Sequence, residues 1–270
     1  MKLTEQQIER YSRQIILPEV GGKGQKKLLN SKVLIIGCGG LGSPCAYYLA
    51  SAGIGKIGLV DSDNVKLNNL HRQILHSNCD IGKPKVESAK QKLNSINPDV
   101  EIVTYRLRLN SKNIMDIIKD YDIVVDGSDN FPTRYLVNDA CVMSKKPLVH
   151  AGILRFDGQA TLIIPKEGPC YRCIFQEPPP PGMVPSCQEA GILGVVAGVL
   201  GLIQATEVLK YLLGIGELLV GKLIVFNALE MNFRKLNIRR NPDCPVCGDN
   251  PTIKELIDYE QFCGIKQNGG

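Results

Sequence analysis

Two pairs of cysteines share a spacing that suits a metal ion. Cys170 and Cys173 form one C-x-x-C pair, and Cys244 and Cys247 form a second pair far along the chain. A tight turn in such a pair aims both thiolates at one ion, and four thiolates complete a closed tetrahedral zinc site. A redox dithiol is the alternative, but it would explain one pair and leave the other without a role. The spacing therefore predicts a structural zinc site that joins two distant segments.

A glycine-rich segment directly follows the first apolar run of the sequence. Gly37, Gly39 and Gly42 form a G-x-G-x-x-G pattern, and Asp61 ends the next apolar run. Glycines permit a tight turn and the close approach of phosphates, a helix N-terminus supplies free amide donors, and the acid suits a ribose hydroxyl. The alternative is that the glycines serve only the packing of a helix on a sheet. The combination favours nucleotide binding.

Cations and amides accompany this motif. The group consists of Arg13, Gln14, Asn69, Arg72, Gln73 and Lys85. A dehydrogenase needs the glycine turn and the acid but has no use for several additional cations. Cations directed at one helix N-terminus suit a triphosphate, whose charge must be neutralised before an anionic nucleophile can approach. Any one of these residues alone would by default be a solvated surface group, but together they favour ATP.

Acidic residues follow a later apolar run. Asp126, Asp129 and Asn130 come at the expected carboxyl edge of a sheet, where open α/β folds bind ligands. A carboxylate at that edge could hold Mg²⁺ against phosphates, and Asp129 is the residue we expect to do so. Asp126 is better explained as a strand cap or turn residue.

Cys187 stands apart from the two cysteine pairs. It follows a proline-rich stretch and precedes a glycine-rich helical pattern, so a nearby helix N-terminus would lower the pKa of its thiol. A buried, inert cysteine is an equal alternative. The remaining cysteines are expected to be small buried hydrophobic residues, and the three histidines show no metal-binding spacing.

These residues must be positioned by an α/β fold. Apolar, strand-like runs cover residues 32–37, 56–61, 100–107, 121–127 and 147–153. Helical patterns lie between them near residues 40–52, 83–93, 111–119 and 133–143. This alternation predicts a Rossmann-like, doubly wound and mostly parallel sheet that is buried on both faces.

The second half of the chain is expected to extend this sheet. Two further strands are predicted over residues 222–227 and 231–239, and the cysteine pairs would make this extension zinc-stapled. The expected regions are a helical arm (1–30), an ATP-binding region (31–165), an extension of the same domain (166–250) and a tail (251–270). The apolar run 190–203 is only fourteen residues long before Gln204, too short for a membrane span, and predicts a core or subunit-interface helix.

Composition narrows the range of partners. The 270 residues include 32 Lys and Arg interspersed with 27 Asp and Glu, which is not the basic stripe of a nucleic-acid binder. Hydrophobic residues make up 44% and charged residues 22%, as in a globular protein. The charged start MKLTEQQIERYSRQ lacks the apolar core of a secretory signal, so we expect a cytoplasmic location.

Several blocks of the sequence resemble the MoeB/ThiF/HesA family, the bacterial relatives of ubiquitin-activating enzymes. In chain order the blocks are RYSRQIILPEVG, GCGGLGSP, DSDNVKLNNLHRQ, GKPKVESA, DGSDNFPTRYLVNDACV, CYRC, SCQEAGILG and CPVCG. They extend from about Arg10 to Gly248. The resemblance implies a homodimeric enzyme that uses ATP and Mg²⁺ to adenylate the C-terminal glycine of a ubiquitin-like sulfur-carrier protein ending in Gly-Gly, in thiamine or molybdopterin biosynthesis.

The resemblance also implies roles for individual residues. The ATP site would consist of Gly39, Gly42, Asp61, Asp63, Asn69, Arg72, Gln73, Lys85, Asp129 and Asn130. Arg13 would reach the phosphates held by the partner subunit. Cys187 matches a motif cysteine that joins the carrier during sulfur transfer in the ThiF branch and is dispensable in the MoeB branch, and a sulfurtransferase or cysteine desulfurase would be a further partner. An NAD-dependent oxidoreductase and a non-catalytic, zinc-stapled nucleotide-binding protein are the alternative functions.

Overall fold

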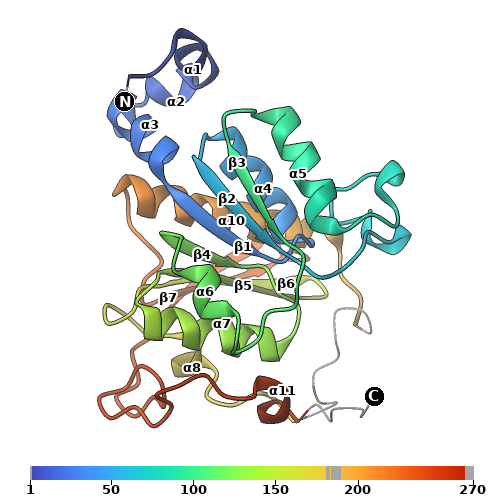
Figure 1. The fold of residues 1–270 in the computed structure, drawn as a ribbon. Helices are drawn as coiled ribbons and strands as arrows, with labels where there is room; N and C mark the ends of the chain where they lie inside the picture. The colour runs from blue at the N-terminus through green and yellow to red at the C-terminus, as the bar shows by residue number, and fades with distance from the viewer. Residues whose placement is uncertain (1, 181–182, 184–189, 265–270) are drawn as a thin grey trace.

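One sheet of eight strands forms the centre of the molecule, in the order β3-β2-β1-β4-β5-β6-β7-β8 (Figure 1). The computed structural model describes residues 2–180, 183 and 190–264. The strands are β1 (Lys32–Ile36), β2 (Lys56–Val60), β3 (Glu101–Tyr105), β4 (Ile123–Asp126), β5 (Leu148–Leu154), β6 (Asp157–Ile163), β7 (Lys222–Asn227) and β8 (Asn232–Asn237). Pairing is parallel from β3 to β5 and antiparallel from β5 to β8. The predicted α/β class and mostly parallel sheet are confirmed.

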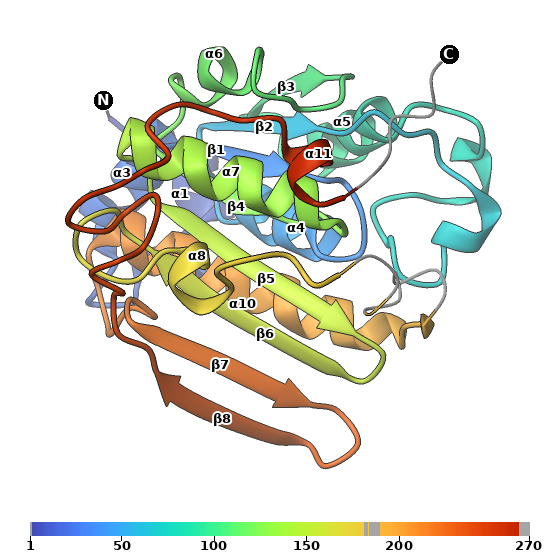
Figure 2. The ribbon, with the colours of Figure 1, turned by 90° about the horizontal axis from the view of Figure 1, so that it is seen from below.

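Helices cover both faces of the parallel part (Figure 2). One face carries α3 (Gly21–Asn30), α4 (Gly42–Ser51), α5 (Lys85–Ile96) and α10 (Gly194–Leu213). The other face carries α6 (Ile114–Ile118), α7 (Phe131–Ser144), α8 (Tyr171–Ile174) and α11 (Tyr259–Phe262). In β1 the side chains of Val33 and Ile35 pack in the first layer, and those of Leu34 and Ile36 pack in the second. Because side chains alternate along a strand, burial on both faces requires the continuous apolar runs seen in the sequence.

The sheet extension contains a strand that the sequence pattern did not separate. β6 pairs with β5 through a tight reversal in which Leu154 faces Asp157. Arg155 occupies the left-handed region there, with φ of 55°. Glycine or asparagine normally marks such a turn, so the sequence LRFD gave no turn signal.

Helices occur in both the predicted arm and the predicted tail. The region predicted as an arm contains α1 (Glu5–Arg10), α2 (Ser12–Ile15) and α3. The predicted tail 251–270, however, contains α11, whose Tyr259 is buried against α7. The described part of this region therefore covers part of the second core layer.

Helix α10 is longer than the apolar run suggested. Within the described part of the chain it is the one helix whose length and apolar composition would allow it to cross a membrane. Gln204 is nevertheless fully buried and donates to the carbonyls of Asp126 and Val149, at 2.7 and 3.1 Å. A Cβ on Gly201 would lie 2.4 Å from the Leu41 carbonyl oxygen, so this glycine lets α10 approach the backbone before α4. These contacts agree with a core helix.

Candidate functional site

A pocket of about 320 Å³ opens at the carboxyl ends of the parallel strands. Successive strands contribute lining residues in spatial order: Leu107 and Leu109 after β3, Asp61 after β2, Gly39 after β1, Asp129 after β4 and Ile153 from β5. Neighbouring strands lie about 4.8 Å apart, so the lining spans four strand spacings, on the order of 19 Å. β1 lies between β2 and β4 at the point where the strand order reverses, which is where open α/β sheets bind ligands.

The glycine loop is fixed at Cys38 from two directions. The backbone amide of Cys38 donates to Oδ2 of Asp61 at 2.9 Å, and its carbonyl oxygen lies 3.1 Å from Nε2 of His76. A Cβ on Gly42 would lie 1.9 Å from the Gly37 carbonyl oxygen, so Gly42 is required for the turn itself. Gly39 lines the pocket, whereas Gly42 is not among the lining residues. His76 was given no role from the sequence, because its function here depends on tertiary contact alone.

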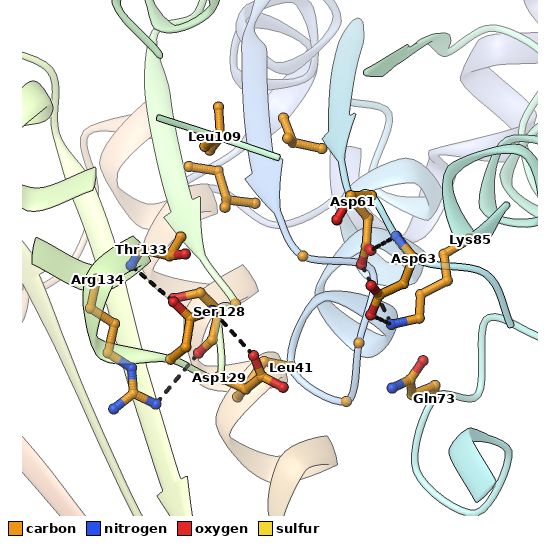
Figure 3. Close-up of a pocket in the computed structure, with 18 of the residues that line it drawn as sticks. Leu41, Asp61, Asp63, Gln73, Lys85, Leu109, Ser128, Asp129, Thr133 and Arg134 are labelled. Atoms are coloured by element: carbon orange, nitrogen blue, oxygen red, sulfur yellow. Dashed lines mark hydrogen bonds and ion pairs between the residues drawn. The ribbon is translucent and has the colours of Figure 1, made fainter. Parts of the chain in front are cut away.

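Asp61, Asp63 and Lys85 form a charged group at one end of the pocket (Figure 3). The Lys85 ammonium donates to Oδ2 of Asp63 at 2.9 Å and lies 3.8 Å from Oδ2 of Asp61. Burial raises the pKa of Asp61, although the Lys85 charge and the amides of Asp63 and Cys38 oppose that rise. Lys85 therefore lines the pocket with its ammonium close to two carboxylates.

Arg72 and Gln73 reach the pocket from the segment after η1 (Leu67–Asn69). Nη1 of Arg72 donates to the Asn68 carbonyl oxygen at 2.9 Å. Gln73 is only 4% exposed, and its Oε1 has no hydrogen-bond partner among the described residues. Burying a polar atom without a hydrogen-bond partner costs free energy, so Oε1 of Gln73 is one point where a bound ligand could donate a hydrogen bond.

The acidic residues after β4 separate into two environments. Asp129 is exposed to the pocket, and its nearest described partner is Nδ2 of the Asn130 side chain, which donates to Oδ1 of Asp129 at 3.4 Å. The side chain of Asn130 also caps α7 by accepting from the Thr133 amide at 3.0 Å. Asp126 is buried, accepts from the Ser128 amide at 3.0 Å, and lies 2.8 Å from Nδ1 of His150. The turn role expected for Asp126 is present, and its pairing with His150 is additional.

Two of the expected site residues, Asn69 and Arg13, lie away from the pocket. Asn69 is buried, accepts from the Lys66 amide at 3.0 Å and does not line the pocket, because it caps η1. Arg13 lies on α2, which packs on α3 at the amino ends of the strands, opposite the pocket (Figure 1). Cys187 lies outside the described residues.

The pocket also contains residues that the sequence did not single out. Arg134, in the first turns of α7, lines the end of the pocket beyond Asp129 (Figure 3). Its Nη2 donates to the Ser128 carbonyl oxygen at 3.4 Å, while Nε of Arg134 and Oγ of Ser128 are buried without partners in the described chain. The available signal was position, since Arg134 is the fourth residue of the helix that begins shortly after Asp129.

The four paired cysteines come together as the spacing predicted. All four Sγ atoms lie within 4.8 Å of one another, with Cys170 3.6 Å from Cys244 and Cys173 3.3 Å from Cys247. Thiolates bound to one zinc at about 2.3 Å in a tetrahedron lie about 3.8 Å apart, so the geometry fits that ion. With four sulfur ligands the site would have no open position for substrate.

A buried ion pair attaches the cysteine cluster to the core. Arg172, between Cys170 and Cys173, donates from Nε and Nη2 to the Asp139 carboxylate at 2.9 and 2.8 Å. The Tyr259 hydroxyl donates to the same carboxylate at 2.8 Å. The pair is fully hydrogen-bonded, which is the condition under which buried charges are tolerated.

Comparison with known proteins places this chain among adenylating enzymes. It is 52% identical to a sulfur carrier protein adenylyltransferase of Thermus thermophilus, over 98% of this chain and 100% of that protein. It is also 52% identical to the adenylyltransferase and sulfurtransferase MOCS3 of Aedes aegypti, over 98% of this chain but only 61% of that longer protein.

Solved structures share the fold. The crystal structure of E. coli MccB with ATP superposes with a TM-score of 0.78 at 30% identity, covering 89% of this chain and 75% of that one. A family model described as the ThiF family matches residues 11–246. With its pocket at the strand ends, its four-cysteine cluster and this match over most of its length, the chain belongs to the ThiF family.

Proposed function

We propose that this chain uses ATP to adenylate the C-terminal glycine carboxylate of a ubiquitin-like sulfur-carrier protein. The similarity to the Thermus thermophilus sulfur carrier protein adenylyltransferase along both whole chains supports the reaction class. The observation that carries the proposal is the order of chemical groups along the pocket: apolar side chains, an acid, the glycine loop with cations, a second acid and a further cation.

This order matches the parts of the reactants. Leu107 and Leu109 would contact the adenine, and Asp61 would accept from the ribose. Gly39 would admit the phosphates close to the backbone, with Arg72 and Lys85 neutralising their charge. The part of the pocket beyond Asp129 then remains for the carboxylate that attacks the α-phosphorus.

The attacking group needs no general base. A terminal carboxylate has an ordinary pKa of about 3.3 to 3.7 and is ionised at neutral pH. The chain must instead reduce repulsion between anions and stabilise charge on the departing pyrophosphate. Arg72 and Lys85 would do this from the described pocket. Asp129 is exposed there and is not ion-paired within the described residues, so it fits Mg²⁺, which when bound would neutralise phosphate charge.

We assign the four-cysteine cluster to a structural zinc ion. The sulfur distances and the closed donor set support this assignment, and Arg172 would transmit the rigidity of the cluster to α7 and α11. Arg13 lies at the amino ends of the strands, opposite the pocket, so its proposed contact with phosphates requires a second copy of the chain. The proposal therefore includes a homodimer with shared sites.

The test is ATP–pyrophosphate exchange with the purified chain and a small carrier protein ending in Gly-Gly. We expect exchange that requires both ATP and the intact carrier, and none with a carrier that lacks its last glycine. Exchange without carrier, or nucleotide binding with no exchange under any condition, would contradict adenylation. Turnover of a nicotinamide cofactor would instead identify an oxidoreductase.

A further inference from the structure

Asp126 and His150 form a buried pair at the start of the loop that carries Asp129. The two residues are register partners on the parallel strands β4 and β5, so their side chains project from the same face of the sheet. Nδ1 of His150 lies 2.8 Å from Oδ2 of Asp126, and the two side chains are 2% and 0% exposed. Neither group takes part in the proposed adenylation, so the pair calls for a separate explanation.

The hydrogen bond within this pair has one direction. Burial raises the pKa of Asp126, but the bond from His150 is the main effect that holds it below its ordinary value, so the group is a carboxylate and only accepts. His150 therefore donates from Nδ1. Nε2 of His150 is buried without a partner in the described chain, which suits a nitrogen that carries no proton, and burial lowers the pKa of the imidazole.

The other carboxylate oxygen of Asp126 holds the loop after β4. Oδ1 accepts from the Ser128 amide at 3.0 Å. The neighbouring peptide lies against the glycine loop, since a Cβ on Gly37 would lie 2.8 Å from the Gly127 carbonyl oxygen. The loop that presents Asp129 therefore contacts the loop proposed to admit the phosphates, and the Asp126 carboxylate fixes its path at Ser128.

Asp129 depends on this backbone path for its position. The nearest described partner of its side chain is Nδ2 of Asn130, at 3.4 Å, and Asn130 belongs to the same loop. Ser128 and Asp129 both line the pocket (Figure 3). A shift of the backbone at Ser128 would therefore move the Asp129 carboxylate within the pocket.

His150 controls the side chain of Asp126 and not its backbone. Gln204 holds the backbone separately, by donating to the Asp126 carbonyl oxygen at 2.7 Å. Among the residues that the structure describes, no donor other than His150 reaches Oδ2 of Asp126. The Tyr171 ring packs on the imidazole with a centroid distance of 4.7 Å and restricts its rotation. Loss of the Nδ1 donor would leave a buried carboxylate oxygen unsatisfied, which costs free energy until the carboxylate rotates or takes up a proton.

We propose that His150 is a positioning residue for Asp129. It orients the Asp126 carboxylate, which holds the Ser128 amide and thereby places Asp129 where it can hold Mg²⁺ against the phosphates of ATP. This inference rests on the proposed function for the role of Asp129.

Two variants at position 150 separate the hydrogen bond from the space that the ring fills. His150→Asn keeps a donor close to the place of Nδ1, whereas His150→Leu fills a similar volume without a donor. The matched control is Thr161→Val. Thr161 is the register partner of His150 on β6, is 2% exposed and donates its hydroxyl to the Leu219 carbonyl oxygen at 3.3 Å. All variants are studied as the full-length, metal-loaded chain.

Titration calorimetry with MgATP, and with ATP in the presence of EDTA, measures the link to Asp129. In His150→Leu we expect the Kd for MgATP to rise about tenfold and the Kd for metal-free ATP to change less than about twofold. His150→Asn and Thr161→Val should stay within about twofold of the wild type for both ligands. Wild-type affinities in His150→Leu, equal weakening of both ligands, or equal losses in the Asn and Leu variants would each overturn the inference.

A double-mutant cycle tests whether the two residues act through one path. Asp129→Asn should raise the Kd for MgATP at least as much as His150→Leu, and the double variant should equal Asp129→Asn alone. Losses that multiply in the double variant would refute positioning through Asp129.

Nitrogen-15 spectra test the contacts without ATP. In histidine-labelled wild type, the His150 ring, assigned among the three histidines with His150→Asn, should carry a proton on Nδ1. An unprotonated Nδ1 refutes the inference even if His150→Leu does not fold.

The Ser128 amide signal reports the position of the loop. It should shift in His150→Leu and stay in place in Thr161→Val, and an unshifted signal in His150→Leu would refute the positioning role. If the wild type itself binds MgATP no more tightly than metal-free ATP, a shifted signal still supports the positioning of the loop and places the failure in the proposed function.

Discussion

The Lys85 ammonium lies 3.8 Å from Oδ2 of Asp61, and both side chains are about nine-tenths buried. The same carboxylate oxygen accepts from the Cys38 amide, so one oxygen atom holds the glycine loop and faces the lysine. Removing the lysine leaves a buried carboxylate with two backbone donors and no cation.

Lys85→Met is therefore expected to damage both binding and folding. The Kd for ATP should rise because a phosphate partner is lost, and the free energy of unfolding should fall by about 1 to 3 kcal/mol because Asp61 loses its counter-charge. Lys23→Met is the control, since Lys23 is exposed on α3 and does not line the pocket. Titration calorimetry and urea unfolding measure the two effects. Equal behaviour of the two variants would contradict the role of Lys85.

Arg72→Ala should lower pyrophosphate exchange on the order of a hundredfold, because one charged contact to the developing pyrophosphate is worth about 3 kcal/mol. Mixing this variant with Arg13→Ala tests the shared site. A mixed dimer would contain one site with both lesions and one intact site, so about one quarter of wild-type activity should return at random assortment. Absence of recovery in verified mixed dimers would rule out the contribution of Arg13 across the interface.

Metal analysis should find one zinc per chain. Cys173→Ser and Cys244→Ser should each lose the ion and lower the melting temperature, because structural zinc binding contributes directly to folding free energy. The control is Cys79→Ser, since Cys79 is exposed and outside the cluster. Full stability after complete removal of the metal with a chelator would refute a structural role.

Stability should fall as the pH is lowered from 7 to 5.5. Burial lowers the pKa of His76 and of His150 in the folded chain, whereas the ordinary value of about 6.5 applies after unfolding. Below that value the unfolded state binds more protons, so each histidine removes at most about 1.4 kcal/mol per pH unit from the free energy of unfolding. Urea unfolding at the two pH values should show a smaller decrease for His76→Gln. An unchanged slope, with zinc retained, would refute the assignment.

Cys187→Ala distinguishes the two family branches. Adenylation requires a carboxylate, ATP and Mg²⁺, so exchange should stay within about twofold of the wild type whichever branch applies. If the thiolate of Cys187 joins the activated carrier, thiocarboxylate formation should be lost, and mass spectrometry of the carrier would detect this. Normal thiocarboxylate formation would show that Cys187 is dispensable, and loss of exchange would contradict the adenylation mechanism.

The sheet could be predicted in large part because its signal is local. Strand β1 was expected over 32–37 and spans Lys32–Ile36, since a run buried on both faces must be apolar at every position. Strand β3 is shorter than the expected 100–107, ending at Tyr105 before the exposed Arg106. Strand β6 was not distinguished from β5 in the sequence, because the turn between them has Arg155 rather than glycine in the left-handed conformation.

The pocket was predictable where residues follow strands or belong to the group of cations and amides near the glycine loop. Asp61 directly follows β2, Asp129 lies three residues after β4, and both line the cavity together with Arg72, Gln73 and Lys85. Asn69 resembles a ligand in sequence but caps a short helix, a choice that local hydrogen bonds decide. His76 gave no signal, because it contacts a segment that is distant in sequence and reached only after the chain has folded.

The cysteine cluster also implies an order of events during synthesis. Each close contact between its two pairs joins residues 74 positions apart, and Cys247 lies after the last strand of the sheet. The ion therefore cannot be enclosed until Cys247 has left the ribosome, and by then all the strands of the sheet have already left it. Metal binding would then be a late step that stabilises an already formed sheet. A chelator present during translation should therefore leave a chain whose strands have paired but whose second layer is not yet packed.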